Sequence, residues 1–130
     1  MTSIWQLSWN AKNYDAEGRM LAAAASESGK NILQSWGRSP ITNIDKIKTG
    51  DIVYISCSKK CIGKAIVTQP FMQTVQIAKD DFVIDHGKRH DNRWYCQLYI
   101  TEVYFGEHCL PLRGNQNTFC NPKNAFWKNM

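Results

Sequence analysis

Three stretches of the sequence combine aromatic rings, amides and positive charges within a few residues of one another. They are SWNAKNY (8–14), SWGRS (35–39) and RGNQNTFCNP (113–122). Aromatic faces stack on nucleobases, amides hydrogen-bond to base edges, and lysine or arginine side chains hold phosphates. Such loops are typical of proteins that bind nucleic acid. Each also has a purely structural interpretation, with Trp9 or Trp36 as packing residues and the asparagines as turn formers.

Metal-ligating residue types occur in two spaced pairs. Cys57 and Cys61 form one Cys-x3-Cys pair, and His86 and His90 form a His-x3-His pair. Two cysteines and two histidines are ligands that structural zinc accepts. The gap between the pairs is about twice that of a classical zinc finger, however, and Cys57 closes an apolar strand where buried thiols are common. Zinc stays open as a minor alternative, and neither a metal nor another cofactor is predicted.

Motifs of catalysis are missing from the sequence. There is no glycine-rich loop ending in Lys-Ser or Lys-Thr, and no Gly-x-Ser-x-Gly segment. A thiol nucleophile needs a base within reach, and the sequence around the histidines pairs none of them with Cys61, Cys96 or Cys109. The acidic pair Asp80-Asp81 follows a lysine, as solvated turns often do. We therefore expect a protein that is not an enzyme.

Charge and composition narrow the class of partner. Sixteen Lys and Arg against eleven Asp and Glu give a formal net charge of +5 in 130 residues, which favours a polyanion because phosphate neutralisation releases counterions. No apolar run approaches the roughly 18 residues of a membrane span. The odd number of five cysteines and the lack of an export signal predict free thiols. We expect one domain over residues 1–130, an intracellular protein (cytoplasmic or nuclear), and no membrane partner.

The pattern of apolar residues predicts a mixed α+β protein. Alternation over 4–9 indicates a strand, residues 19–27 favour a helix broken at Gly29, and 34–40 is typical of a loop. A short helical turn is expected over 41–50. Strands 51–57 and 62–71 are predicted to form a hairpin around a tight polar turn, and 94–105 is the longest strand candidate. This order favours a small, strongly bent β-barrel with covering helices.

The segment SWGRSPITNIDKIKTGDIVYISCSKKCIGKAIVTQPF resembles the EVE-type members of the PUA-like superfamily. The matching residues are Trp36, Gly37, Arg38, Lys48, Gly50, Asp51, Val53, Tyr54, Gly63 and Pro70. The related YTH domains, which read N6-methyladenine in RNA, are similar in LSWNAKNYD and in GNQNTFCNP. The resemblance covers roughly Ile4 to Pro122, and it implies a PUA-like barrel that binds a modified base in RNA or in single-stranded or flipped DNA.

The resemblance also implies roles for particular residues. Trp36 would be one wall of an aromatic cage around an extruded base, Asn10 would bond to the base edge, and Ser35 would take an exocyclic N–H. Phe71, Phe82 and Trp9 are alternatives for the second wall. Phosphate contacts would come from basic residues as a group: Lys12, Arg38, Lys59, Lys60, Lys88, Arg89 and Arg113.

Two questions stay open at this level. The base is of the N6-methyladenine or 5-methylcytosine type, or carries another modification. A second class of function, a non-catalytic domain whose exposed aromatic residues bind a protein partner, also fits the sequence.

Overall fold

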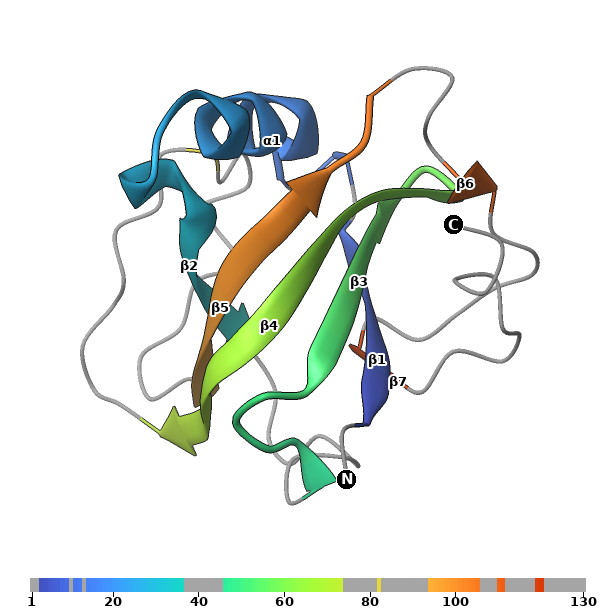
Figure 1. Cartoon of the computed structure of the whole chain (residues 1–130). Helices are drawn as coiled ribbons and strands as arrows, with labels where there is room; N and C mark the ends of the chain where they lie inside the picture. Colours follow the sequence, from blue (N-terminus) through green and yellow to red (C-terminus); the bar gives the residue numbers. More distant parts are fainter. Residues whose placement is uncertain are drawn as a thin grey trace.

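A computed structural model of the protein describes residues 3–9, 11–12, 14–36, 46–73, 82, 94–105, 110–111 and 119–120. In residues 33–36, 73, 94, 110–111 and 119–120 it describes the backbone alone. These ranges form one mixed sheet with helices at one end (Figure 1). In chain order the elements are β1 (Ile4–Trp9), α1 (Ala16–Ala25), the 3-10 helix η1 (Ser28–Lys30), β2 (Asn31–Trp36), β3 (Ile52–Cys57), β4 (Lys60–Gln73), β5 (Trp94–Val103), β6 (Leu110–Pro111) and β7 (Phe119–Cys120).

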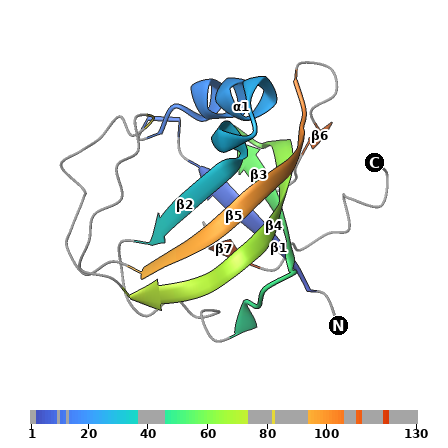
Figure 2. The same cartoon turned by 60° about the vertical axis from the view of Figure 1, so that its left-hand side comes forward.

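The seven strands follow the order β2-β5-β4-β3-β1-β7, and β6 pairs with the beginning of β4. Only β1 and β3 run parallel to each other in these pairings, with Ile4 opposite Ile52 and Trp9 opposite Cys57. The sheet is bent, so that β1 and β3 pass behind β4 and β5 in the view of Figure 2. The β4–β5 ladder shifts register at three places, and such bulges increase local twist and curvature.

The α+β class agrees with the prediction from sequence, whereas closure into a barrel is not seen. In the described ranges, β2 and β7 are the two ends of the sheet order and no pairing joins them. The described helices are α1 and η1, and both lie beside the end of the sheet at which β5 terminates (Figure 1). Neither is long and apolar enough to cross a membrane.

Two predicted boundaries differ from the observed ones for identifiable reasons. The predicted loop over 34–40 begins inside β2, because the backbone of Gln34, Ser35 and Trp36 pairs with β5. The helix begins at Ala16 rather than Arg19, because the side chain of Asp15 caps it. The predicted strands of the hairpin and the long strand agree with β3, β4 and β5 to within a few residues.

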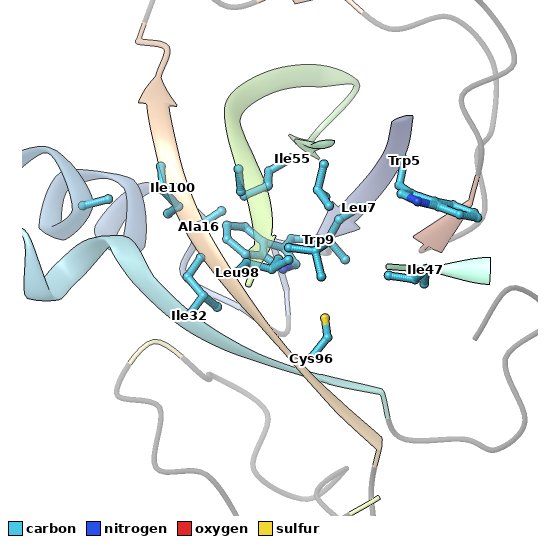
Figure 3. Packing of buried hydrophobic residues seen from close by; sticks show 14 of the residues in the cluster. Trp5, Leu7, Trp9, Ala16, Ile32, Ile47, Ile55, Cys96, Leu98 and Ile100 are labelled. Atoms are coloured by element: carbon cyan, nitrogen blue, oxygen red, sulfur yellow. The ribbon is translucent and has the colours of Figure 1, made fainter. Parts of the chain in front are cut away.

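The core lies along the inner face of the bent sheet, from Ala16 of α1 at one end to Trp5 and Ile47 at the other (Figure 3). Alternate residues of β1, namely Trp5, Leu7 and Trp9, point into it, and Ala16, Met20 and Ala23 of α1 lie on the same helix face and are buried. Gly63 of β4 brings the helix close, because a Cβ there would lie 3.2 Å from the Met20 Sδ. This packing fixes α1 across the end of the sheet.

Asp51 joins the beginnings of β1 and β3. Its side chain is buried, with 3% exposed, and accepts hydrogen bonds from the backbone N–H of Ser3 (3.1 Å) and Lys48 (3.0 Å) and from Trp5 Nε1 (2.9 Å). Gly50, with φ of +92°, turns the chain into this position. Burial acts to raise the pKa of Asp51, but the three hydrogen bonds prevail and hold it below its ordinary value.

Candidate functional site

A cavity of about 380 Å³ opens at the end of the sheet where α1 lies. Three segments far apart in the chain line it: the connection from β1 into α1, the β3–β4 hairpin, and the residues that follow β5. Three aromatic residues, Tyr14, Tyr104 and Phe105, belong to the lining, and Met20 and Ile62 add apolar surface. The cavity therefore offers mainly apolar and aromatic contacts to a ligand, as small-molecule and base sites do.

Tyr14 is positioned by Trp9. The two ring centroids lie 4.7 Å apart with the planes inclined by 45°, a favourable tilted arrangement of aromatic pairs. Trp9 itself is buried at the end of β1, with 7% exposed, and belongs to the core. The core tryptophan thus supports a half-buried tyrosine at the edge of the cavity.

The first turn of α1 contributes two carboxylates to the lining, from Asp15 and Glu17. Asp15 Oδ1 accepts a hydrogen bond from the Gly18 N–H (3.0 Å), and the Asp15 N–H donates to the Phe82 carbonyl (2.7 Å). A Cβ at Gly18 would collide with the Asp15 carboxylate, so glycine permits this cap. The cap therefore fixes the acidic edge of the cavity.

The turn between β3 and β4 forms the opposite edge. Cys57 pairs with Lys60, so Ser58 and Lys59 form a two-residue loop, and both have positive φ (52° and 64°). Such loops favour asparagine and glycine, because a Cβ disfavours the left-handed conformation. Ser58 lines the cavity, and Lys59 and Lys60 are exposed beside it. A conformationally costly turn thus contributes Ser58 to the lining and is followed by two exposed lysines.

The chain beyond β5 completes the wall. The Tyr104 N–H donates to the Ile62 carbonyl (2.9 Å), and the Tyr104 hydroxyl donates to Glu102 Oε2 (2.8 Å). Burial and the Glu102 carboxylate raise the pKa of Tyr104 far above its ordinary value, so the ring stays neutral at physiological pH. Phe105 is 42% exposed, which is high for a phenylalanine.

The lysines Lys12, Lys59 and Lys60, predicted as phosphate ligands, are exposed at this end of the sheet. Lys12 follows Ala11, which lines the cavity, and the other two follow Ser58. Within the described lining the charged side chains are the two carboxylates of α1. The lining thus includes two acidic residues, and the three lysines are neighbours or near neighbours in sequence of residues in the lining.

Trp36 lies at the other end of the sheet. Its backbone pairs with that of Trp94, which in turn pairs with Gln73 at the end of β4. Val103, next to the cavity, is nine residues along β5 from Trp94, about 30 Å of strand. Trp36, the predicted base-stacking residue, therefore lies far from the cavity and from Lys12, Lys59 and Lys60.

The other predicted base-binding residues are dispersed. Phe71 is in the core, with 9% exposed, and Ser35 precedes Trp36 in β2. Phe82 is half-buried and lies under the Arg19 guanidinium, whose Cζ is 5.4 Å from the ring centroid. The remaining predicted residues lie outside the described ranges: Asn10, Arg38, Lys88, Arg89 and Arg113.

The zinc alternative gains no support within the described ranges, where no three His, Cys, Asp or Glu residues come together. Cys57 is half-buried in the lining of the cavity, and Cys61 is buried with its Sγ 3.6 Å from the Gly63 carbonyl. His86 and His90 lie outside the described residues. Cys57 and Cys61 are free thiols, as is Cys96.

Sequence reasoning did not assign Tyr14, Tyr104 or Phe105 to a site. Tyr14 falls inside the stretch SWNAKNY, one of the three stretches predicted to bind nucleic acid. Tyr104 and Phe105 extend a strand-like pattern, and only the end of β5 at Val103 shows that they lie beyond the sheet ladder. Comparison with protein-family models gives no match to this chain, and a search of curated proteins gives no significant match.

Proposed function

We propose that this domain binds single-stranded nucleic acid, RNA or an unpaired strand of DNA, and recognises a modified base. The observation that supports it best is the aromatic-lined cavity with Lys12, Lys59 and Lys60 around its mouth. Base–aromatic stacking contributes about 1–3 kcal/mol per base, and lysines beside it add phosphate binding. A strand lying along the sheet would reach both the cavity and Trp36.

Trp36 keeps the role that the resemblance to EVE and YTH domains implies, as a wall against which the modified base stacks. Its backbone partner Trp94 is our candidate for the second wall, because directly opposed residues of an antiparallel pair are nearest neighbours on one face of a sheet. A methyl group adds apolar surface, so a dry aromatic slot favours the modified base by burial. On this proposal the sheet belongs to a PUA-like barrel.

The decisive experiment is a fluorescence titration with single-stranded RNA and DNA oligomers, with and without N6-methyladenine or 5-methylcytosine. Wild-type protein, Trp36→Ala and Trp94→Ala are compared at two salt concentrations. We expect tighter binding of one modified oligomer and loss of that preference in both variants. A preference that survives both substitutions would contradict the role of Trp36.

Salt dependence separates phosphate binding from an aromatic interface with a protein partner. On single strands the slope of log K against log salt is about −0.7 per neutralised phosphate, so Lys59→Ala/Lys60→Ala should reduce it by about 1.4. Lys59→Arg/Lys60→Arg keeps both positive charges at the same positions and is the matched control. Equal slopes in the two double variants would show that Lys59 and Lys60 do not neutralise phosphates. Binding that does not depend on salt would favour a protein partner.

A further inference from the structure

The cavity beside α1 has two acidic residues in its lining, Asp15 and Glu17. The carboxylates of Asp15 and Glu17 are acceptors only, and the described lining includes no lysine or arginine. The N-cap bond uses Asp15 Oδ1, and Oδ2 has no hydrogen-bond partner among the described residues. A ligand that matches this edge presents N–H donors.

The aromatic part of the lining suits a flat cation. Tyr14 is held against Trp9, and Phe105 is substantially exposed at the mouth. A cation over a tyrosine or phenylalanine face gains cation–π attraction of about 0.5–2 kcal/mol beyond stacking. The hydroxyl of Tyr104 is bonded to Glu102, and this ring stays neutral, so it does not add negative charge to the wall.

The rim imposes the opposite requirement. Lys59 and Lys60 follow Ser58 of the lining and are exposed, and Lys12, also exposed, follows Ala11 of the lining. They attract an anionic group that remains outside while the cationic, donor-bearing part enters. A nucleotide whose base is positively charged satisfies both conditions, and an unmodified base or a simple ammonium ion satisfies only one.

We infer that the cavity binds an N7-methylated guanine nucleotide. Methylation at N7 gives the base a positive charge, and the N1–H and N2–H groups of guanine present two adjacent donors that match the two oxygens of a carboxylate. Glu17 is our candidate for this pairing, with the base between Tyr14 and Phe105 and its phosphate at the lysines. The inference rests on the proposed function only in taking the ligand to be a nucleotide, and it concerns a different place from Trp36.

The test is calorimetric titration of the whole chain with 7-methylguanosine 5′-monophosphate, guanosine 5′-monophosphate and N6-methyladenosine 5′-monophosphate. We expect the 7-methylguanosine nucleotide to bind about tenfold or more tightly than the other two. Glu17→Gln should remove most of that preference while leaving the fold intact, because Glu17 is exposed. Glu27→Gln is the control, because it removes another exposed carboxylate beyond the other end of α1.

Each other outcome has a defined meaning. Equal affinity for the 7-methylated and unmodified guanosine nucleotides, or an unchanged preference in Glu17→Gln, overturns the inference. Salt-sensitive binding of oligomers without binding of the 7-methylated nucleotide overturns it and leaves the proposed function standing. Binding of the 7-methylated nucleotide without oligomer binding supports it and removes the proposed function. Tighter binding of a trimethyl-lysine peptide overturns the nucleotide assignment.

Discussion

Replacement of Asp51 by asparagine should destabilise the whole sheet. In the wild-type protein the carboxylate accepts from three N–H donors, Trp5 Nε1, the Ser3 N–H and the Lys48 N–H, at 2.9–3.1 Å. An asparagine oxygen in the place of Oδ2 would still accept from Trp5 Nε1 and the Lys48 N–H, but as a neutral and weaker acceptor, and the NH₂ group in the place of Oδ1 would face the Ser3 N–H. Hydrogen bonds to a charged group contribute about 1.5–3 kcal/mol, and a buried donor left without an acceptor costs about 1–3 kcal/mol.

The Trp5 bond is fully buried, whereas the bonds to Ser3 and Lys48 are partly buried, so water replaces part of the loss at the latter two. We therefore expect a decrease of about 3 kcal/mol in the free energy of unfolding, which corresponds to a decrease in Tm of about 10 °C at this chain length. Urea denaturation followed by far-UV circular dichroism at pH 7 measures the change in the free energy of unfolding. Asp15→Asn is the matched control, because asparagine caps a helix as well as aspartate does.

The same variant tests the ionisation of Asp51. A pKa held below the ordinary value stabilises the folded state above the unfolded pKa, near 4, and that contribution is lost as the pH falls through the folded-state pKa. The difference between wild type and Asp51→Asn should therefore shrink below pH 4. A difference below 0.5 kcal/mol at pH 7 (about the spread of surface substitutions) would refute the hydrogen-bond reasoning. An undiminished difference at pH 3 would refute the ionisation.

Three further outcomes follow from the geometry of the cavity and the core. Lys59→Gly should raise the free energy of unfolding by about 1 kcal/mol, because glycine accepts the positive φ, and should weaken oligonucleotide binding in the same protein. Tyr14→Ala should shift tryptophan emission to the red by exposing Trp9 and should weaken nucleotide binding, whereas Tyr14→Phe should do neither. Cys96, which is fully buried and whose pKa is raised by burial to about 12, should resist N-ethylmaleimide at pH 8 until urea unfolds the protein, whereas mass spectrometry should show the half-buried Cys57 modified before Cys61 and Cys96.

Much of the sheet could be predicted because its strands carry their own signals. In β3 and β4, apolar residues alternate with polar ones or follow one another directly, and a polar turn separates the two strands. In β1, apolar residues recur at every second position, as in a half-buried strand. β2 has no such signal at its end: Gln34, Ser35 and Trp36 are followed by Gly37, and the pattern is typical of a loop. Their strand conformation depends on pairing with β5, some sixty residues later in the chain, which no local pattern contains.

The cavity could not be predicted, for a related reason. Its lining comes from three segments that meet only when β1, β3 and β5 end on the same side of the sheet. The charge pattern indicated lysines as a group but not their position relative to an aromatic ring. Asp51 shows the converse case, because it belongs to the motif that carries the family resemblance and yet the structure gives it a structural role that the motif alone does not reveal.

The turn at Ser58 and Lys59 is the place where the local chemistry of the sequence and the fold disagree most clearly. Two residues with side chains occupy left-handed conformations that asparagine and glycine would accept at lower cost, and the register of the same hairpin shifts between Ile55 and Ser56. Strained backbone persists where the surrounding structure imposes it, and it is concentrated at functional sites. Here the two residues in the left-handed conformation are Ser58, which lines the cavity, and the exposed Lys59, which follows it. Because this strained turn lies at the edge of the cavity, the first binding experiments should examine this end of the sheet as well as Trp36.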